Sequence, residues 1–217
     1  MLGVLEQTTL IPSKAFYWRG DKYLQKSENG YEVDYTQDDV AKLYKCFAEY
    51  GVDAAQIFID TMNECGIRPW LALRMNDVHF GEDATSFIRS DMYYAAKEAN
   101  EMVGPEYGYF GYGFDFKYPR YRNAILGYIE ELLNKYDIFG LELDFMREIF
   151  CFDYKNEPDC AKIMTEYIRE IRMLTNAASK RIGHDIKLLI RICRDPKDAL
   201  DFGFDIKRMC EEDCLMQ

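Results

Sequence analysis

Three short apolar segments, each preceded by a segment of helical periodicity, dominate this sequence. They span residues 70–75, 138–146 and 186–193, and each has the length and composition of a buried strand. Helix followed by strand, repeated along a chain, predicts parallel strands joined by right-handed crossovers. The sequence therefore predicts an α/β fold, either an open doubly wound sheet or a (β/α) barrel.

The remaining elements follow from periodicity and from capping residues. The expected helices cover residues 36–51, 53–66, 118–136 and 158–178, with two short helices beginning at Pro196 and near Asp205. Residues 15–18 are a weaker candidate for a strand, and the rest of segment 1–35 shows no clear pattern. Residues 81–117 form a long, partly helical excursion. No glycine-rich phosphate loop follows any predicted strand, which removes the main support for a nucleotide-binding sheet.

The predicted strands carry charge on one face only. Side chains alternate between the two faces of a strand, so sequence position assigns the face. In each strand one face is apolar, and the other carries charge towards the C-terminal end, at Arg74, Glu142, Asp144 and Arg191. Helices on both sides of an open sheet would bury these charges at a high cost. A barrel lets them meet at its mouth, so the pattern favours a TIM-type (β/α) barrel with outer helices.

Further polar residues follow directly after the predicted strands. Asn76, Asp77 and His79 come after the first of the three, and Arg147 and Glu148 come after the second. Active sites of (β/α) barrels lie at the C-terminal ends of the strands and in the loops that follow. We therefore expect a binding site there, with Arg191 facing it from the third strand. The alternative is an internal ion-pair network without a ligand.

Paired carboxylates near strand ends suit glycoside hydrolysis, in which one acid protonates the leaving oxygen and the other acts as nucleophile or base. Asp144 is the strongest catalytic candidate because it is last on its strand. Glu142 is the second, although its deeper position suits an electrostatic partner of an arginine better. Asp77 is placed to orient His79 or to bind a sugar hydroxyl. Metal binding by Asp77, His79 and Asp144 stays open, but their spacing is not diagnostic, and we predict neither metal nor cofactor.

Residues 107–116 (YGYFGYGFDF) are unusually aromatic, with glycine interleaved. Such a segment provides flat surfaces on which sugar rings stack, and Tyr112 is the predicted substrate-binding residue within it. The alternative is a small aromatic core under a long loop.

Composition narrows the classes of partner. The 217 residues are 48% hydrophobic, enough for one core, so we expect one domain. A net charge of −11 argues against nucleic acid, and no apolar run reaches the roughly 18 residues of a spanning helix. The seven cysteines include no CxxC pair and are expected to be reduced thiols. As the sequence stands no signal peptide is recognised, which favours a cytoplasmic protein.

At residues 73–79 (LRMNDVH) and 140–147 (GLELDFMR) the chain resembles a family of glycoside-hydrolase-like TIM-barrel proteins, many of them of unknown function. Weaker likenesses extend this over about residues 45–210. The resemblance implies a TIM barrel, a carbohydrate substrate and the binding residues Arg74, Asn76, Asp77, His79, Asp144 and Arg147. The resemblance does not imply a catalytic mechanism.

The barrel is expected to be incomplete. A full barrel typically has about 250 residues and eight strands, more than are predicted here. We therefore expect a single partial barrel over residues 1–217, whose open sheet edges favour homo-oligomers. The predicted function is that of a glycoside hydrolase-like protein that acts on or binds carbohydrate. The alternatives are a non-catalytic sugar-binding module and a structural half-barrel.

Overall fold

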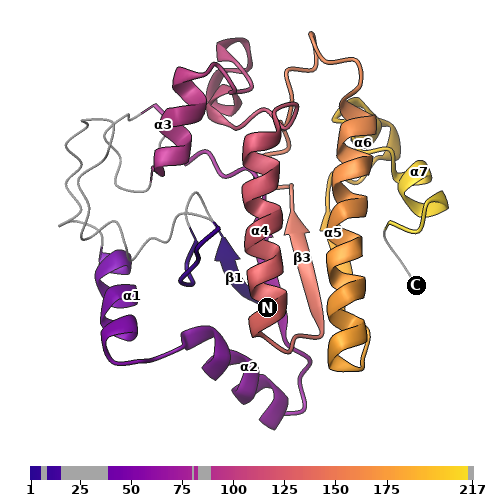
Figure 1. The fold of residues 1–217 in the computed structure, drawn as a ribbon. Coiled ribbons are helices and arrows are strands. Elements are labelled where there is room, and N and C mark those ends of the chain that lie inside the picture. Colours follow the sequence, from indigo (N-terminus) through magenta and orange to yellow (C-terminus); the bar gives the residue numbers. More distant parts are fainter. Residues whose placement is uncertain (6–8, 16–38, 80, 83–88, 215–217) are drawn as a thin grey trace.

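A parallel sheet of four strands lies at the centre of the fold (Figure 1). The structure is a computed structural model that describes residues 1–5, 9–15, 39–79, 81–82 and 89–214. The strands are β1 (Leu2–Leu5), β2 (Trp70–Arg74), β3 (Gly140–Asp144) and β4 (Lys187–Arg191). Each strand pairs with the one before it in the chain, which gives the order β1-β2-β3-β4. The α/β prediction is confirmed, but within the described residues the sheet is open and does not close into a barrel.

Three of the four strands are those that the sequence predicts. β2, β3 and β4 fall inside the apolar segments, each shorter than the segment itself. β1 was not predicted, because four residues that include a glycine carry too little pattern to be recognised as a strand. Residues 16–18 of the weaker candidate strand lie outside the described residues.

The helices largely agree with the sequence pattern. They are α1 (Asp39–Glu49), α2 (Ala54–Glu64), α3 (Asp91–Glu98), the 3-10 segment η3 (Pro105–Tyr112), α4 (Pro119–Lys135), α5 (Cys160–Ile182), α6 (Pro196–Asp201) and α7 (Ile206–Glu211). Asp53 caps α2 and accepts a hydrogen bond from the backbone nitrogen of Gln56 at 3.0 Å. Gly51, with a φ of 65°, takes the left-handed conformation that follows α1. Thr36, the predicted cap of that helix, lies outside the described residues.

The long helices α4 and α5 cover one face of the sheet (Figure 1). Leu71, Leu141 and Leu188 are register partners on that face, and all three are buried. α4 and α5 pack side by side over them (Figure 1), and α2 contributes Ile59 to the same core. On the opposite face Leu189 remains 44% exposed. A doubly wound sheet would carry helices on both faces, so the described part of the chain follows the one-sided arrangement.

The aromatic segment after α3 folds over the carboxyl ends of the strands. Phe110 stacks on Phe150 with ring centroids 4.7 Å apart, and Phe114 stacks on Tyr121 at 4.0 Å. These rings form the small aromatic core that was one of the two expectations for this segment. Tyr109 differs, because its side chain remains 41% exposed.

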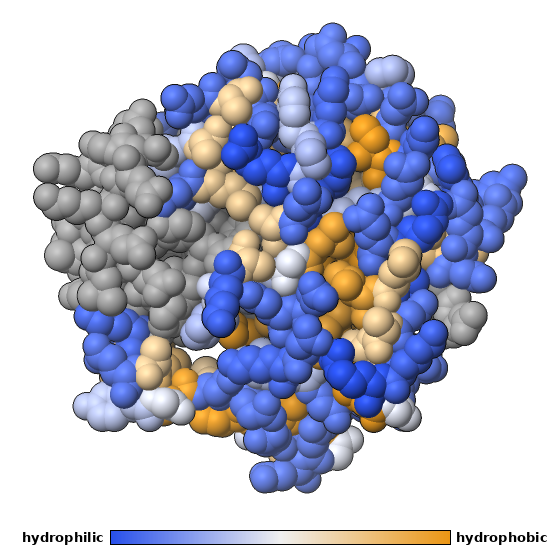
Figure 2. Space-filling view, in the orientation of Figure 1, coloured by the Kyte–Doolittle hydropathy of each residue, from blue (hydrophilic) through white to orange (hydrophobic). Residues whose placement is uncertain are grey.

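The outer side of the helical layer is mostly hydrophilic, with hydrophobic strips between the helices (Figure 2). Among the described helices none is both long and apolar enough to cross a membrane. All seven cysteines lie in described residues and none forms a disulfide. Cys151 and Cys214 are buried and pack within the hydrophobic core.

Candidate active site

The charged residues predicted to meet at the strand ends are neighbours in the structure. Arg74 of β2, Asp144 of β3 and Arg191 of β4 are register partners on adjacent strands. Neighbouring strands lie about 4.8 Å apart, so the three backbone positions fall within roughly 10 Å. The predicted convergence of these three residues is therefore confirmed. Their roles in binding or catalysis stay predictions.

Asp144 is held by two donors. The Arg191 guanidinium donates to Oδ2 at 2.9 Å, and the backbone nitrogen of Met146 donates to Oδ1 at 2.9 Å. Arg74 instead donates to Oδ2 of Asp77 at 3.3 Å, three residues along its own chain segment. Both carboxyl oxygens of Asp144 therefore accept a hydrogen bond, one of them from a cationic donor.

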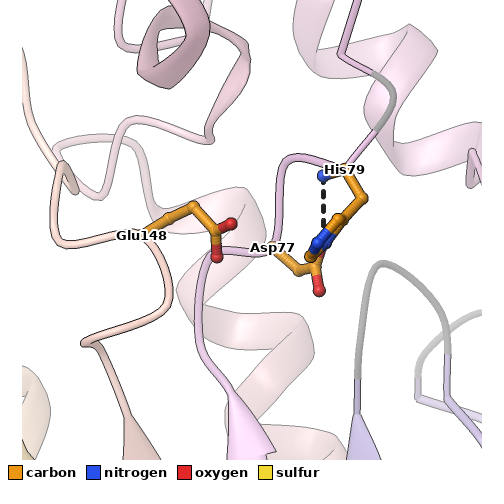
Figure 3. Close-up of side chains that lie close together, drawn as sticks. All are labelled: Asp77, His79 and Glu148. Carbon is orange, nitrogen blue, oxygen red and sulfur yellow. Dashed lines mark hydrogen bonds and ion pairs between the residues drawn. The ribbon is translucent and has the colours of Figure 1, made fainter.

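Asp77 and His79 form a compact pair in the loop after β2 (Figure 3). Oδ1 of Asp77 accepts from the backbone nitrogen of His79 at 2.9 Å and lies 2.5 Å from the ring atom Nδ1. If Nδ1 donates to Asp77, the neutral ring presents Nε2 as an acceptor, and the Arg147 guanidinium contacts this atom. The expectation that Asp77 orients His79 agrees with these contacts.

Glu148 completes the site from the loop after β3. Its residue is only 4% exposed, and its carboxyl group is turned towards Asp77 (Figure 3). Oε2 is buried and accepts no hydrogen bond from the described residues, while Arg147 Nε lies 3.9 Å from Oε1. Burial raises the pKa of Glu148 to about 7, and the charge of Asp77 adds to the rise. Arg147 and Arg74 act in the opposite direction.

The same three groups could be considered as metal ligands. Asp77, His79 and Glu148 each offer one ligand atom, and these atoms all lie within 4.8 Å of one another. However, Oδ1 of Asp77 is engaged with His79 and Oδ2 with Arg74. The cationic Arg147 contacts the other ring nitrogen. A cation would have to displace both arginines, so the contacts favour a hydrogen-bonded network over a metal site.

Asn76, predicted to bind substrate, supports the backbone instead. Its residue is 1% exposed, and Nδ2 donates to the backbone oxygens of Phe114 and Phe150 at 3.0 and 2.9 Å. Oδ1 accepts from the backbone nitrogen of Phe114 at 2.9 Å. The prediction that Asn76 contacts substrate is therefore replaced by a positioning role, in which its amide joins three loops at the strand ends.

Glu142 lies one pleat below Asp144 on the face opposite the helices. It is 6% exposed, and burial followed by the charge of Asp144 raises its pKa, while Arg191 acts in the opposite direction. The sequence suggested an arginine partner for Glu142, but the guanidinium of Arg191 pairs with Asp144. Arg191 therefore acts on Glu142 through its charge, but among the described residues it forms its ion pair with Asp144.

Two tyrosines of η3 stand beside this network. Burial raises the pKa of the Tyr109 phenol, and the negative charges of Glu148 and Asp77 raise it further. These charges place Tyr109 within electrostatic reach of the site. Tyr112, the predicted stacking residue, is partly buried and packs on Gly81, where an added Cβ would lie 2.5 Å from the ring.

Sequence reasoning identified the charge of Glu148 without giving that residue a role in the site. The available signal was its place four residues after Asp144, in a loop that follows a strand end. Its burial results from the packing of two distant loops, which no local pattern reveals. Comparison of the sequence with protein-family models and with curated proteins found no match.

Proposed function

We propose that this chain hydrolyses glycosidic bonds at the carboxyl ends of β2, β3 and β4, with Glu148 as general acid and Asp144 as nucleophile or general base. The contrast between these two carboxyl groups carries the proposal. Glu148 is buried with a pKa of about 7, whereas Asp144 accepts from Arg191 and from a backbone amide. Carboxyl groups in contrasting environments can take the separate acid and nucleophile roles of glycoside hydrolysis.

The two environments suit the two roles in proton transfer. A carboxyl with a pKa near 7 retains a proton in much of the population at neutral pH and transfers it to the glycosidic oxygen as the C–O bond breaks. Asp144 attacks the anomeric carbon, or takes a proton from the water that does so. Water supplies the hydroxyl of the released sugar and, in the end, the proton that restores Glu148.

The donors around the acid pair suit a ligand rich in hydroxyl groups. Arg147 and Arg191 keep 49% and 60% of their side chains exposed, and they lie beside Glu148 and Asp144 respectively. Planar guanidinium groups direct several N–H donors at once and bind polar oxygens with defined geometry. We therefore assign substrate contact to Arg74, Arg147 and Arg191, with His79 oriented between Asp77 and Arg147.

The fold supports the same proposal. Strands that follow one another in chain order, with α4 and α5 packed on one face, match part of a (β/α) barrel. We infer that the sheet belongs to a TIM-type architecture, and that the resemblance to glycoside-hydrolase-like proteins at the strand-end motifs reflects a shared site. Barrel active sites occupy this end of the sheet.

A substrate screen tests the proposal. Purified protein is incubated with 4-nitrophenyl glycosides of the common hexoses and pentoses and with polysaccharides, and product is measured by absorbance and by reducing ends. Glu148→Gln and Asp144→Asn are each expected to lower the rate by at least about 100-fold. Glu166→Gln, an exposed carboxyl on α5, is the matched control and keeps the rate. Equal rates in wild type and Glu148→Gln would exclude Glu148 as the acid.

The second candidate is sugar binding without catalysis, which the ion pairs of Arg74 with Asp77 and of Arg191 with Asp144 favour. Carboxylates paired in this way hold the arginine donors in place for sugar hydroxyls without taking part in a proton transfer. This reading predicts that no substrate in the screen is turned over, while oligosaccharide binding survives in both Glu148→Gln and Asp144→Asn.

A further inference from the structure

We infer that a cavity between α3 and η3 is a second sugar-ring subsite, so that the ligand is a neutral oligosaccharide of at least two rings. This inference rests on the proposed function for the place of the first ring. The cavity has a volume of about 590 Å³, within the range of about 300–1,000 Å³ that small-molecule sites occupy. It lies outside the network formed by Asp77, His79 and Glu148.

The walls of the cavity are aromatic and apolar. Tyr93 and Met102 line it from α3 and the segment that follows, and Tyr109 and Tyr112 line it from η3. Tyrosine rings provide flat apolar faces for the C–H side of a pyranose ring, and their hydroxyls add polar contact at the edges. Gly108, with a φ of 58°, permits the bend in η3 that separates Tyr109 from the chain before it.

The polar groups of the cavity select against an anionic ligand. Among the described residues that line it, Glu82, Glu106 and Asp153 carry negative charge and Lys97 carries positive charge. This excess of carboxylates repels a charged acid, whereas uncharged hydroxyl groups can both donate to the carboxylates and accept from the ammonium group. The chemistry therefore matches a neutral sugar ring.

One residue, Tyr109, relates the cavity to the proposed active site. Tyr109 lines the cavity and also lies within reach of the charges of Glu148 and Asp77. The loop that carries Glu148 packs directly on η3, because Phe150 stacks on Phe110 and the Tyr107 hydroxyl donates to Asp153 at 3.0 Å. A chain of sugar rings that leaves the acid pair past Tyr109 would enter this cavity.

Calorimetry with defined sugars tests the subsite. The probes are cellotetraose, xylotetraose, laminaritetraose and chitotetraose, their monosaccharides, and tetragalacturonate as the anionic comparison. At least one neutral tetrasaccharide is expected to bind about 10-fold or more tightly than its monosaccharide, and tetragalacturonate is expected to bind more weakly. Met102→Trp, which fills the cavity, and Lys97→Ala, which removes its only described cation, should each weaken that binding by about 10-fold.

The control variant is Lys207→Ala, because Lys207 is exposed on α7 and away from the cavity lining. Thermal unfolding of every variant verifies that it is folded, and Lys97→Ala keeps the test decisive if Met102→Trp does not fold. The inference is overturned if no neutral tetrasaccharide binds, if monosaccharide and tetrasaccharide bind equally, or if both cavity variants bind like wild type. Turnover is measured separately. Cavity-dependent binding without any hydrolysis contradicts the proposed hydrolase and leaves the subsite in place.

Discussion

Asp144 and Arg191 occupy the same register position on neighbouring strands, and the Arg191 guanidinium donates to Oδ2 of Asp144 at 2.9 Å. The pair links the last residues of β3 and β4 at the edge where the candidate site lies. Its two members differ in exposure, with 60% of the Arg191 side chain and 13% of the Asp144 side chain accessible. An ion pair with one exposed partner orients a carboxylate more than it stabilises a fold.

Replacing Arg191 by Gln is therefore expected to change function more than stability. Exposed ion pairs contribute about 0–1 kcal/mol, so the free energy of unfolding should fall by no more than about 1 kcal/mol. Hydrolysis, or sugar binding if no substrate is turned over, should fall by at least about 10-fold. Urea unfolding and the substrate screen measure the two effects. A stability loss of several kcal/mol with unchanged binding would instead identify a structural ion-pair network.

Asn76 is expected to show the opposite pattern, with a large effect on stability. Asn76→Ala removes three hydrogen bonds to the backbone and leaves buried groups of Phe114 and a part-buried carbonyl of Phe150 without this partner. The expected cost is about 3 kcal/mol by urea unfolding, from about 1 kcal/mol for each bond. Asn123→Ala, an exposed position on α4, serves as the control and should cost less than about 0.5 kcal/mol. A small effect of Asn76→Ala would contradict its positioning role.

Tyr136 is expected to stabilise the contact between α4 and α2. Its hydroxyl lies 3.0 Å from both carboxylate oxygens of Asp53, the residue that caps α2. Tyr136→Phe keeps the buried ring and loses the hydroxyl contacts with Asp53 and Lys135, so we expect a cost of about 1–2 kcal/mol in the free energy of unfolding. Tyr50→Phe is the matched control, because Tyr50 is 79% exposed. Lys135 Nζ also lies 2.7 Å from Oδ2 of Asp53, so equal stability of the two variants would show that Lys135 and the Gln56 backbone nitrogen satisfy Asp53 without Tyr136.

Strands β2, β3 and β4 could be predicted because the alternation of apolar and other side chains is visible within each short segment. Alternating parity in residues 70–75 and 138–146 assigned Leu71 and Leu141 to the core and placed Arg74 beside Asp144 on the other face. β1 could not be recognised because residues Leu2–Leu5 are too few to show a period. Closure of the sheet depends on pairing between distant strands, which side-chain parity does not encode.

For the candidate site, the sequence predicts which charged residues lie together, but not their burial or their hydrogen-bond partners. Residues at strand ends share one edge of a parallel sheet, so Asp77, Asp144 and Arg191 were expected together. The burial of Glu148, and with it the raised pKa, could not be predicted, because it arises where the loop after β3 packs under the aromatic segment. The role of Asn76 was also hidden, since its partners are backbone groups 38 and 74 residues away.

The pH dependence of stability and rate should both report on Glu148. Its pKa is about 7 in the folded chain and near 4.5 when unfolded, so the folded state binds the proton more tightly. The contribution of Glu148 to the free energy of unfolding is fully present below about pH 4.5. It is lost as the pH rises through about 7, which lowers the free energy of unfolding by about 3 kcal/mol. Glu148→Gln removes this loss, so urea unfolding from pH 5 to pH 8 should show a flatter profile in the variant. Asp115, whose pKa burial raises to about 6, is present in both proteins and cancels in the comparison. The wild-type hydrolysis rate should fall above about pH 7, as the acid loses its proton. If wild type and Glu148→Gln showed parallel profiles of stability against pH, Glu148 would have the same pKa in the folded and unfolded chain. The assignment of Glu148 as general acid would then lose its support.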